Sequence, residues 1–247
     1  MSNIITDINR IISLARQAGK IILDYYHADY STEIKSDDSP VTQADIAADK
    51  FIVDGLLEIA PQIPIISEEG NKILPAGSHS FWLVDPLDGT KGFINKTGQF
   101  TVNIGLIENG KPTLGVIYIP TEDKMYWGSS AGAFLDGKPI SCREAPADGL
   151  VVAASKSHRD AHTDDYIKHL NVKKFVPAAS SLKFCMLAEG VADLYPRFGT
   201  TMEWDVAAGH AILQAAGGIM HNPDGSEFQY NKPEFRNSGG FIANGKR

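Results

Sequence analysis

Two aspartates three residues apart follow an apolar run in the segment 82–90. Asp85 and Asp88 flank Pro86, which restricts the backbone so that both carboxylates can turn toward one point, and Gly89 lets a ligand approach the main chain closely. Binding sites commonly form where a strand ends. Two interpretations stay open for this segment alone: a divalent metal site, or an ordinary solvated loop.

Three further acids could reach the same point. Glu68 and Glu69 follow another short apolar run, and Asp205 follows Trp204 at the start of an alanine-rich segment. Each has an ordinary alternative: an exposed acidic pair for the glutamates, and a residue that caps a helix or favours its positive dipole end for Asp205. It is the combination of these acids that indicates chemistry.

Carboxylates gathered at one point need positive charge. Two of them about 4 Å apart repel by about 4 kcal/mol at an effective dielectric of about 20, so a cluster demands divalent cations or protons. Oxygen ligands without histidine or cysteine favour Mg²⁺, which keeps water and substrate phosphate in its coordination shell. Two such ions are suited to phosphoryl transfer to water.

Charge and composition limit the partners. The 247 residues carry 23 Lys and Arg against 30 Asp and Glu, a net charge of −7, which repels the polyphosphate backbone of a nucleic acid. A phosphorylated small molecule must therefore be held by local groups. The hydrophobic fraction of 43% is that of an ordinary globular chain with a sizeable core.

Cysteine usage and the apolar pattern indicate the compartment. Cys142 and Cys185 form neither a disulfide framework nor a zinc site, which favours a reducing environment. No uninterrupted apolar run approaches ~18 residues, and residues 1–7 lack the pattern of a signal peptide. We expect a cytoplasmic protein without an integral membrane segment; peripheral association with the inner membrane and the oligomeric state stay open.

The first part of the chain should contain two long helices and a β-rich middle. Helical spacing predicts an amphipathic helix over 6–26, and a capping-box pattern from Thr42 to Asp45 opens a second helix to about Ala60. The helices would cover one face of a sheet. Strands are expected at 65–67, 81–84, 100–107 and 114–119, with hairpin turns at Asn109-Gly110 and Asp136-Gly137.

From about Gly149 strands and helices alternate. Strands are expected at 150–154, 175–176 and 193–195, and helices at 160–170, 181–188 and 205–216. We therefore expect an α+β half over residues 1–145, with most of the acids, and an α/β half over residues 146–247. No linker composition near the boundary suggests independent motion.

The acidic strings resemble the signature set of a known family. They are Glu68, Asp85-Pro86-Leu87-Asp88-Gly89-Thr90 and Trp204-Asp205-Val206-Ala207-Ala208-Gly209. With them, essentially the whole chain is similar to the inositol monophosphatase superfamily of Mg²⁺-dependent, lithium-sensitive phosphatases. The resemblance implies an αβαβα layered sandwich, part α+β and part α/β, of the inositol monophosphatase and fructose-1,6-bisphosphatase sugar-phosphatase type. The metal cluster would lie at the seam between the halves.

The same resemblance implies a ligand set for two Mg²⁺ ions. Glu68, Asp85 and the Leu87 carbonyl would hold one ion. Asp85, Asp88 and Asp205 would hold the other, so that Asp85 bridges the pair. A third ion in the active site stays open.

Two residues would act on the attacking water. In the family, the threonine at the position of Thr90 orients this water, and the aspartate at the position of Asp45 hydrogen-bonds the threonine hydroxyl or helps bind a further metal. A capping role is the alternative for Asp45. The amides of Gly89 and Thr90 could cradle phosphate oxygens, and the charge of Lys91 favours a substrate with a second phosphate, although an exposed lysine is equally ordinary.

Further strings are similar to the bacterial 3'(2'),5'-bisphosphate nucleotidase branch of the superfamily, in segments 38–45, 88–91, 155–158, 180–184 and 195–198. This resemblance implies residues that bind the nucleoside and the phosphate that is not cleaved. Besides Asp205 and the residues of the 89–91 turn, they are Ser155, Ser157, His158, Ser180, Lys183 and Arg197. Lysine supplies a point charge to a phosphate and arginine a bidentate fork.

The implied reaction is hydrolysis of adenosine 3',5'-bisphosphate to AMP and phosphate within sulfate assimilation, with the sulfated nucleotide PAPS as a second substrate. The alternative enzyme is an inositol or sugar monophosphatase that shares the metal residues. A nucleotide-binding regulatory module without turnover is a third alternative. The mutually repelling acids argue against it, because a binding module has no need of them.

Overall fold

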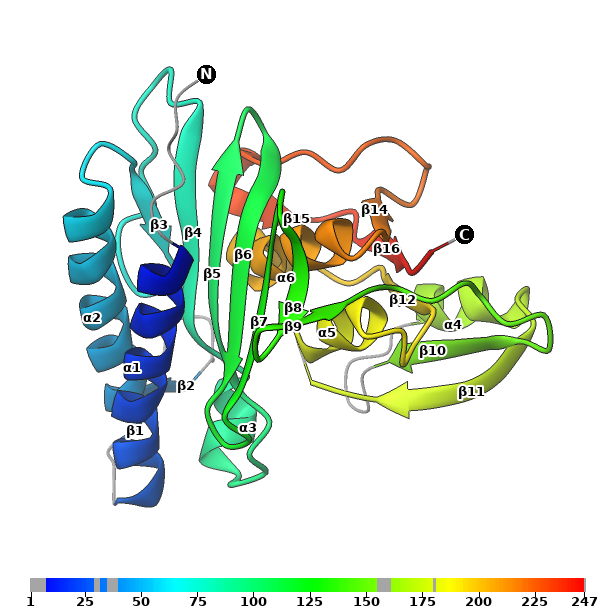
Figure 1. Ribbon diagram of the computed structural model, residues 1–247, viewed down its shortest axis with the longest axis horizontal. Coiled ribbons are helices and arrows are strands. Elements are labelled where there is room, and N and C mark those ends of the chain that lie inside the picture. The colour runs from blue at the N-terminus through cyan, green and yellow to red at the C-terminus, as the bar shows by residue number, and fades with distance from the viewer. Residues whose placement is uncertain (1–7, 29–31, 35–39, 155–160, 180, 247) are drawn as a thin grey trace.

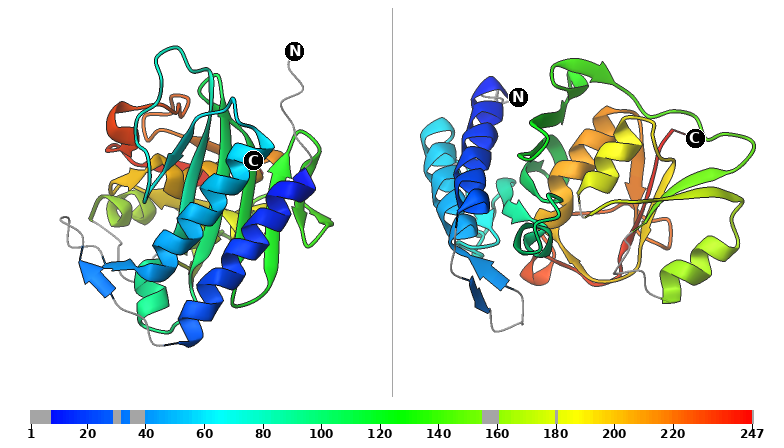
Figure 2. Two further views of the ribbon diagram at one scale, coloured as in Figure 1. Left: turned by 90° about the vertical axis from the view of Figure 1, so that its left-hand side faces the viewer. Right: turned by 90° about the horizontal axis from the view of Figure 1, so that it is seen from below.

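The computed structural model describes residues 8–28, 32–34, 40–154, 161–179 and 181–246. Its elements form five layers, helix, sheet, helix, sheet and helix, which are seen edge-on in Figures 1 and 2. The expected αβαβα sandwich is therefore confirmed. None of the helices in the described residues combines the length and the apolar character that crossing a bilayer requires.

The first two layers come from the N-terminal part of the chain. Helices α1 (Ile8–His27) and α2 (Gln43–Ile59) pack side by side on one face of a sheet whose seven described strands run in the order β3-β4-β5-β6-β7-β8-β9. The strands are β3 Ile65–Ser67, β4 Ser80–Asp88, β5 Thr101–Glu108, β6 Lys111–Ile119, β7 Lys124–Ser129, β8 Gly132–Leu135 and β9 Lys138–Ile140. A short helix, α3 (Thr90–Ile94), follows β4, and the small ladder of β1 (Thr32–Ile34) and β2 (Pro40–Thr42) precedes α2.

The other layers come from the C-terminal part. Helices α5 (Leu182–Ala188) and α6 (Glu203–Ala215) lie between the two sheets, and α4 (Ala161–Lys168) lies on the outer side of the second sheet (Figure 2). The five described strands of that sheet, in the order β11-β10-β12-β16-β14, are Val172–Pro177, Leu150–Ala154, Leu194–Arg197, Phe241–Asn244 and Ile219–His221. A two-strand ladder of β13 (Thr201–Met202) and β15 (Arg236–Asn237) and a 3₁₀ turn, Pro233–Phe235, complete the elements.

Three glycines let α6 lie close against the first sheet. Gly105, Gly115 and Gly128 are registered partners on β5, β6 and β7. A Cβ atom on Gly115 would stand 2.2 Å from the Ala208 carbonyl oxygen, and one on Gly128 would stand 2.6 Å from the Cα of Ile212. Because neither position has room for a side chain, the sheet accepts the helix backbone directly. This fixes the depth at which the first turn of α6 meets the end of β4.

Most expected elements are present, with shifted ends. Both hairpin turns are confirmed: Asn109-Gly110 joins β5 to β6 and Asp136-Gly137 joins β8 to β9, each with positive φ at both residues. The described part of α2 begins at Gln43, so Asp45 lies in its first turn. Strands β7, β14 and β16 have no counterpart in the sequence-based assignment, because such short runs have no decisive period.

The expectation that β4 ends at Val84 is wrong. The strand continues to Asp88, although its pairing with β5 shifts register between Asp85 and Asp88. Helix α6 likewise begins at Glu203 rather than at Asp205, so that Asp205 lies inside its first turn. The extension of β4 comes from its pairing with β5, and at the start of α6 the Glu203 carboxylate accepts the amides of Asn231 and Lys232; a local sequence pattern foresees neither contact.

Candidate metal centre

The ends of β3 and β4 bring Glu68 and Asp85 together. The two strands are parallel, with Ser67 opposite Val84, and the Glu68 amide donates to the Val84 carbonyl over 3.1 Å. Parallel strands end at the same edge of a sheet, so the next residue of each strand emerges at one point. Successive side chains of a strand point to opposite faces of the sheet. Asp85 therefore lies on the same face as Phe81 and Leu83, which pack in the core shared with α6.

A bulge turns Asp88 to the same face as Asp85. Asp85 pairs with Asn103 and Asp88 with Thr101, so a three-residue step on β4 faces a two-residue step on β5. The extra residue cancels the alternation that would otherwise send the two acids to opposite faces. The Leu87 amide donates to Asp85 Oδ1 over 3.2 Å, which closes the turn around Pro86.

Helix α6 supplies the third acid of the cluster. Glu68, Asp85 and Asp205 each offer a carboxylate oxygen, and these oxygens all lie within 4.8 Å of one another. Asp205 Oδ2 also accepts the Met202 amide over 2.7 Å, so this residue both caps the helix and joins the cluster. The two roles proposed for it from the sequence are therefore compatible. Asp88 is outside this triplet but acts electrostatically on both buried aspartates.

Burial and mutual repulsion raise the pKa values of two acids of this cluster. The pKa of Asp85 is raised well above its usual value, first by burial and then by the charges of Glu68, Asp88, Asp205 and Asp45. Burial and the charge of Asp88 also raise the pKa of Asp205. Converging oxygen donors that resist ionisation in the absence of a cation fit a hard divalent ion such as Mg²⁺.

Two further acids of α2 face this edge of the sheet. Asp45 is 1% exposed, and its charge contributes to the raised pKa of Asp85. Asp49 accepts a hydrogen bond from the Ser67 hydroxyl, directly before Glu68. Burial raises the pKa of Asp49, as does the charge of Glu69, while the Ser67 bond lowers it. Asp49 and Ser67 were not singled out from the sequence, where nothing marks their pairing.

The turn after β4 carries the other expected groups. Thr90 donates its hydroxyl to the Leu87 carbonyl oxygen over 3.3 Å, so the side chain and the carbonyl proposed for water and metal lie together. Gly89 has a φ of 94°, and a Cβ there would meet the Gln99 carbonyl oxygen at 2.6 Å, which requires glycine. Lys91, in the first turn of α3, is exposed.

The residues expected to bind the nucleoside and the uncleaved phosphate are partly described. Lys183 is 2% exposed, with Nζ 3.4 Å from the Ala178 carbonyl oxygen and 4.7 Å from the centre of the Tyr195 ring. Arg197, at the end of β12, donates from Nε to the Gly199 carbonyl over 3.4 Å. Its charge acts on both Asp205 and Lys183, so it faces the carboxylate cluster. The other four residues, Ser155, Ser157, His158 and Ser180, lie outside the described residues.

A second group of buried polar side chains was missed by the sequence analysis. Thr101, Asn103 and Ser181 are each 1% exposed and hydrogen-bond to one another and to Asp88. Asn103 lies inside an apolar strand, and only the register of β5 against β4 reveals its neighbour. A polar residue at an inward position of a strand is the signal that could have identified it.

Glu203 ties the C-terminal segment to the start of α6. Its side chain is fully buried, and its two carboxylate oxygens accept the amides of Asn231 and Lys232, each over 2.9 Å. The Lys232 ammonium lies 3.7 Å from it. Two charge-assisted bonds from one carboxylate hold this loop against the turn that carries Asp205.

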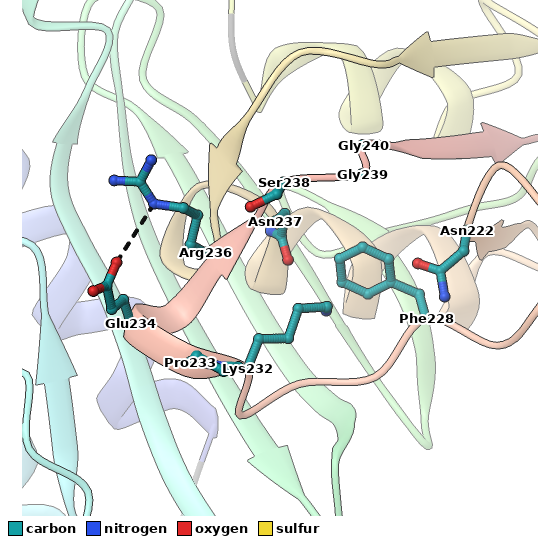
Figure 3. A pocket seen from close by; sticks show the side chains of 10 residues that line it. All are labelled: Asn222, Phe228, Lys232, Pro233, Glu234, Arg236, Asn237, Ser238, Gly239 and Gly240. Carbon is teal, nitrogen blue, oxygen red and sulfur yellow. Dashed lines mark ion pairs between the residues drawn. The ribbon is translucent and has the colours of Figure 1, made fainter.

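The loop before β16 encloses a cavity of about 550 Å³ (Figure 3). No member of the carboxylate cluster lines it, and Glu234 and Arg236 form an ion pair of 3.8 Å at its rim. The lining residues are Asn222, Phe228, Lys232, Pro233, Glu234, Arg236, Asn237, Ser238, Gly239 and Gly240. The cavity is therefore separate from the candidate metal centre.

Comparisons with known proteins agree with this geometry. The model described as "Inositol monophosphatase family" matches residues 6–245. The chain is 45% identical over 241 residues to the 3'(2'),5'-bisphosphate nucleotidase CysQ of Salmonella typhimurium, covering 94% of this chain and 97% of that protein. It is 44% identical to the protein of that name from Escherichia coli K12, with the same coverage.

Solved structures give the same result for the fold. The crystal structure of CysQ from Bacteroides thetaiotaomicron superposes with a TM-score of 0.81 at 35% identity and covers 97% of each chain. The match extends through both sheets and through the elements that carry the carboxylate cluster, Glu68, Asp85 and Asp205. The chain therefore belongs to the inositol monophosphatase family.

Proposed function

We propose that this protein is a metal-dependent 3'(2'),5'-bisphosphate nucleotidase that releases the 3'-phosphate of adenosine 3',5'-bisphosphate. The observation that carries the phosphatase chemistry is the convergence of Glu68, Asp85 and Asp205 within 4.8 Å. The nucleotide specificity is supported by the buried Lys183 beside this cluster and by the nucleotidases to which the chain is 44 to 45% identical. PAPS is the second substrate in this proposal, and sulfate assimilation is its context.

The acids supply two overlapping sets of oxygen ligands for Mg²⁺. Glu68, Asp85 and the Leu87 carbonyl would hold one ion, and Asp85, Asp88 and Asp205 the other, with a third ion left open. The chemistry that bound Mg²⁺ supplies at such a site is neutralisation of phosphate charge and acidification of a water molecule. Burial of the ligands strengthens this electrostatic effect, because the surrounding dielectric is low.

The chain positions the water and the scissile phosphate. The Thr90 hydroxyl lies at the Leu87 carbonyl, where it can hold the attacking water in line and pass on its proton. Asp45, buried beside Asp85, would accept that proton. The amides of Gly89 and Thr90 at the start of α3 would bind the phosphate oxygens.

The nucleotide and its uncleaved phosphate would lie against the C-terminal half. Lys183 and Arg197 carry the charge for the 5'-phosphate, and Lys91 adds to it from the exposed turn of α3. Ser180 would add a hydrogen-bond donor for the same phosphate. Ser155, Ser157 and His158 would bind the nucleoside, and Asp205 would also contact the substrate. We place the reaction in the cytoplasm, where the buried thiols of Cys142 and Cys185 stay reduced.

A substrate panel tests the proposed function. With Mg²⁺ present, phosphate release from adenosine 3',5'-bisphosphate should exceed release from inositol 1-phosphate and fructose 1,6-bisphosphate by about tenfold or more in kcat/KM, because only the nucleotide combines a second phosphate with a nucleoside for the pocket. Inorganic phosphate is measured for the three substrates at equal enzyme. The reverse order would replace this proposal with a sugar or inositol phosphatase.

The pH dependence of substrate preference should reflect the protonation of Lys183. Burial lowers the pKa of Lys183 to about 8, an effect that the charge of Asp88 opposes and that of Arg197 assists. The ammonium is thus charged below about pH 8 and neutral above it. If only the charged form binds the 5'-phosphate, kcat/KM for the bisphosphate should fall about tenfold from pH 7 to pH 9, relative to adenosine 3'-phosphate.

The matched variant for this test is Lys183→Arg, which keeps its charge across the range. Its bisphosphate-to-monophosphate ratio should therefore stay flat between pH 7 and pH 9. Parallel pH profiles for the two substrates in the wild-type protein would remove Lys183 from the second-phosphate site.

A further inference from the structure

Asp88 accepts two hydrogen bonds from two different layers of the fold, the first sheet and the helix layer next to it. The Asn103 side-chain amide of β5 donates from Nδ2 to Asp88 Oδ2 over 3.1 Å. The backbone amide of Ser181, from the turn that begins α5, donates to the same oxygen over 3.1 Å. One carboxylate oxygen is thereby held jointly by the first sheet and by the helix layer behind it.

Two hydroxyl groups complete this network. Thr101 donates its hydroxyl to Asn103 Oδ1 over 3.0 Å, and the Ser181 hydroxyl reaches the same oxygen over 3.2 Å. The two hydroxyl oxygens lie 2.8 Å apart. All four residues are buried, Asp88 being 8% exposed and the other three 1%. Buried polar groups that satisfy one another in this way hold a fixed arrangement.

The chemistry of the donors fixes the direction of the bonds. An ionised carboxylate only accepts hydrogen bonds, so Asn103 must present its NH₂ group to Asp88 and its oxygen to the two hydroxyls. The three contacts among Thr101, Ser181 and Asn103 share two hydroxyl protons. A change at Ser181 therefore redistributes bonds at Asn103, which is itself bonded to Asp88.

Ser181 also lies next to the residues proposed for the second phosphate. It directly precedes α5, and Lys183 lies in the first turn of that helix with its ammonium directed to the Ala178 carbonyl. A phosphate that draws this ammonium away from Ala178 would act on the backbone turn that holds Asp88. Ser181 and Lys183, two residues apart at the start of α5, thus connect a residue proposed for the second phosphate with Asp88.

We propose that Asn103 is a positioning residue for Asp88, and that Thr101 and Ser181 extend it into a link between Lys183 and the metal centre. A phosphate bound at Lys183 would set the orientation of Asp88, so that a bisphosphate gains in kcat as well as in KM over a monophosphate with the same scissile bond. This inference rests on the proposed function. It assigns specificity to residues that touch neither phosphate.

The first test is Mg²⁺ binding by the Asn103→Ala protein. Loss of a partner that orients a ligand typically costs 10–100-fold in metal affinity. We therefore expect the Mg²⁺ dissociation constant, measured by isothermal titration calorimetry on metal-free full-length protein, to rise by about tenfold or more. A value within about twofold of the wild-type one, with an unchanged circular dichroism spectrum, would overturn the positioning role.

The second test uses Thr101→Val, which removes the hydroxyl and keeps the shape and the Asn103 bond to Asp88. We expect kcat for adenosine 3',5'-bisphosphate to fall about tenfold while kcat for adenosine 3'-phosphate changes by less than about threefold. The matched control is Thr113→Val on neighbouring β6, whose hydroxyl bonds to Glu108 away from the cluster. Equal losses of kcat on both substrates would overturn the link.

These measurements separate failure of the inference from failure of the proposed function. If the wild-type protein released no phosphate from the bisphosphate, the proposed function would fail, while the Mg²⁺ comparison would still decide the role of Asn103. If Asn103→Ala did not fold, Asn103→Ser, with its shorter hydroxyl side chain, should show the same direction of change in Mg²⁺ affinity. An unchanged affinity in a folded Asn103→Ser protein would contradict the proposal.

Discussion

Asp85→Asn should lower kcat by roughly a thousandfold or more while leaving the fold intact. Asp85 is the one acid that both proposed ligand sets share, and it lies 2% exposed at the centre of the cluster. Replacing it with a neutral amide removes the charge that holds the ions where phosphate charge develops. Turnover with adenosine 3',5'-bisphosphate is the measurement, and retention of near-normal kcat would remove the bridging role.

The same variant carries a stability readout that distinguishes a lost ligand from a damaged fold. Removing one of several mutually repelling buried carboxylates should raise the Tm of the metal-free protein, since the raised pKa of Asp85 reflects burial and those neighbours. Addition of Mg²⁺ should raise the Tm of the wild-type protein and leave that of the variant nearly unchanged. A metal-free variant that melts below the wild type would instead indicate a structural role.

Arg197→Ala should lower kcat/KM for the bisphosphate by about a hundredfold and that for adenosine 3'-phosphate by no more than about threefold. Loss of a charged, bidentate partner of a phosphate costs about 2–5 kcal/mol where the pair is shielded from water. The Arg197 guanidinium is held at the end of β12 by the Gly199 and Thr200 carbonyls, each at 3.4 Å, so its direction is set before substrate arrives.

The control for this prediction is Arg10→Ala, which removes an equal charge. Arg10 is exposed on α1, in the outermost helix layer, with the first sheet between that layer and α6. Its loss should leave both kcat/KM values nearly unchanged, because a distant surface charge is screened by salt. Similar losses of kcat/KM on both substrates in Arg197→Ala would show that this arginine does not bind the second phosphate.

Local patterns were enough to predict much of the architecture. The spacing of apolar residues in α1 and the asparagine–glycine and aspartate–glycine turns depend on interactions within a few residues, and the structure has these elements nearly where the pattern indicated. The short strands after Lys124 could not be assigned in the same way, because runs this short have no decisive period. Strand ends were wrong where a ladder partner extended them.

The acids of the site could be identified because several carboxylates directly follow apolar runs, a position where charged side chains are uncommon. Their meeting could not be read from spacing. Asp85 and Asp88, three residues apart, would face opposite sides of a regular strand, and the bulge opposite Asn103 is what turns both to one face. The glycines that admit α6 then decide how near Asp205 comes.

The sequence alone determined which side chains this protein has for metal and phosphate, its acidic charge and the kinds of element that carry them, since these follow from residue type and near-neighbour geometry. The tertiary structure decided that Glu68, Asp85 and Asp205 converge and that Asn103 and Ser181 hold Asp88. The physical reason is that these contacts join segments that lie apart in the sequence, some of them by more than a hundred residues. Their distances depend on strand register and on the depth of helix packing, neither of which a local pattern contains.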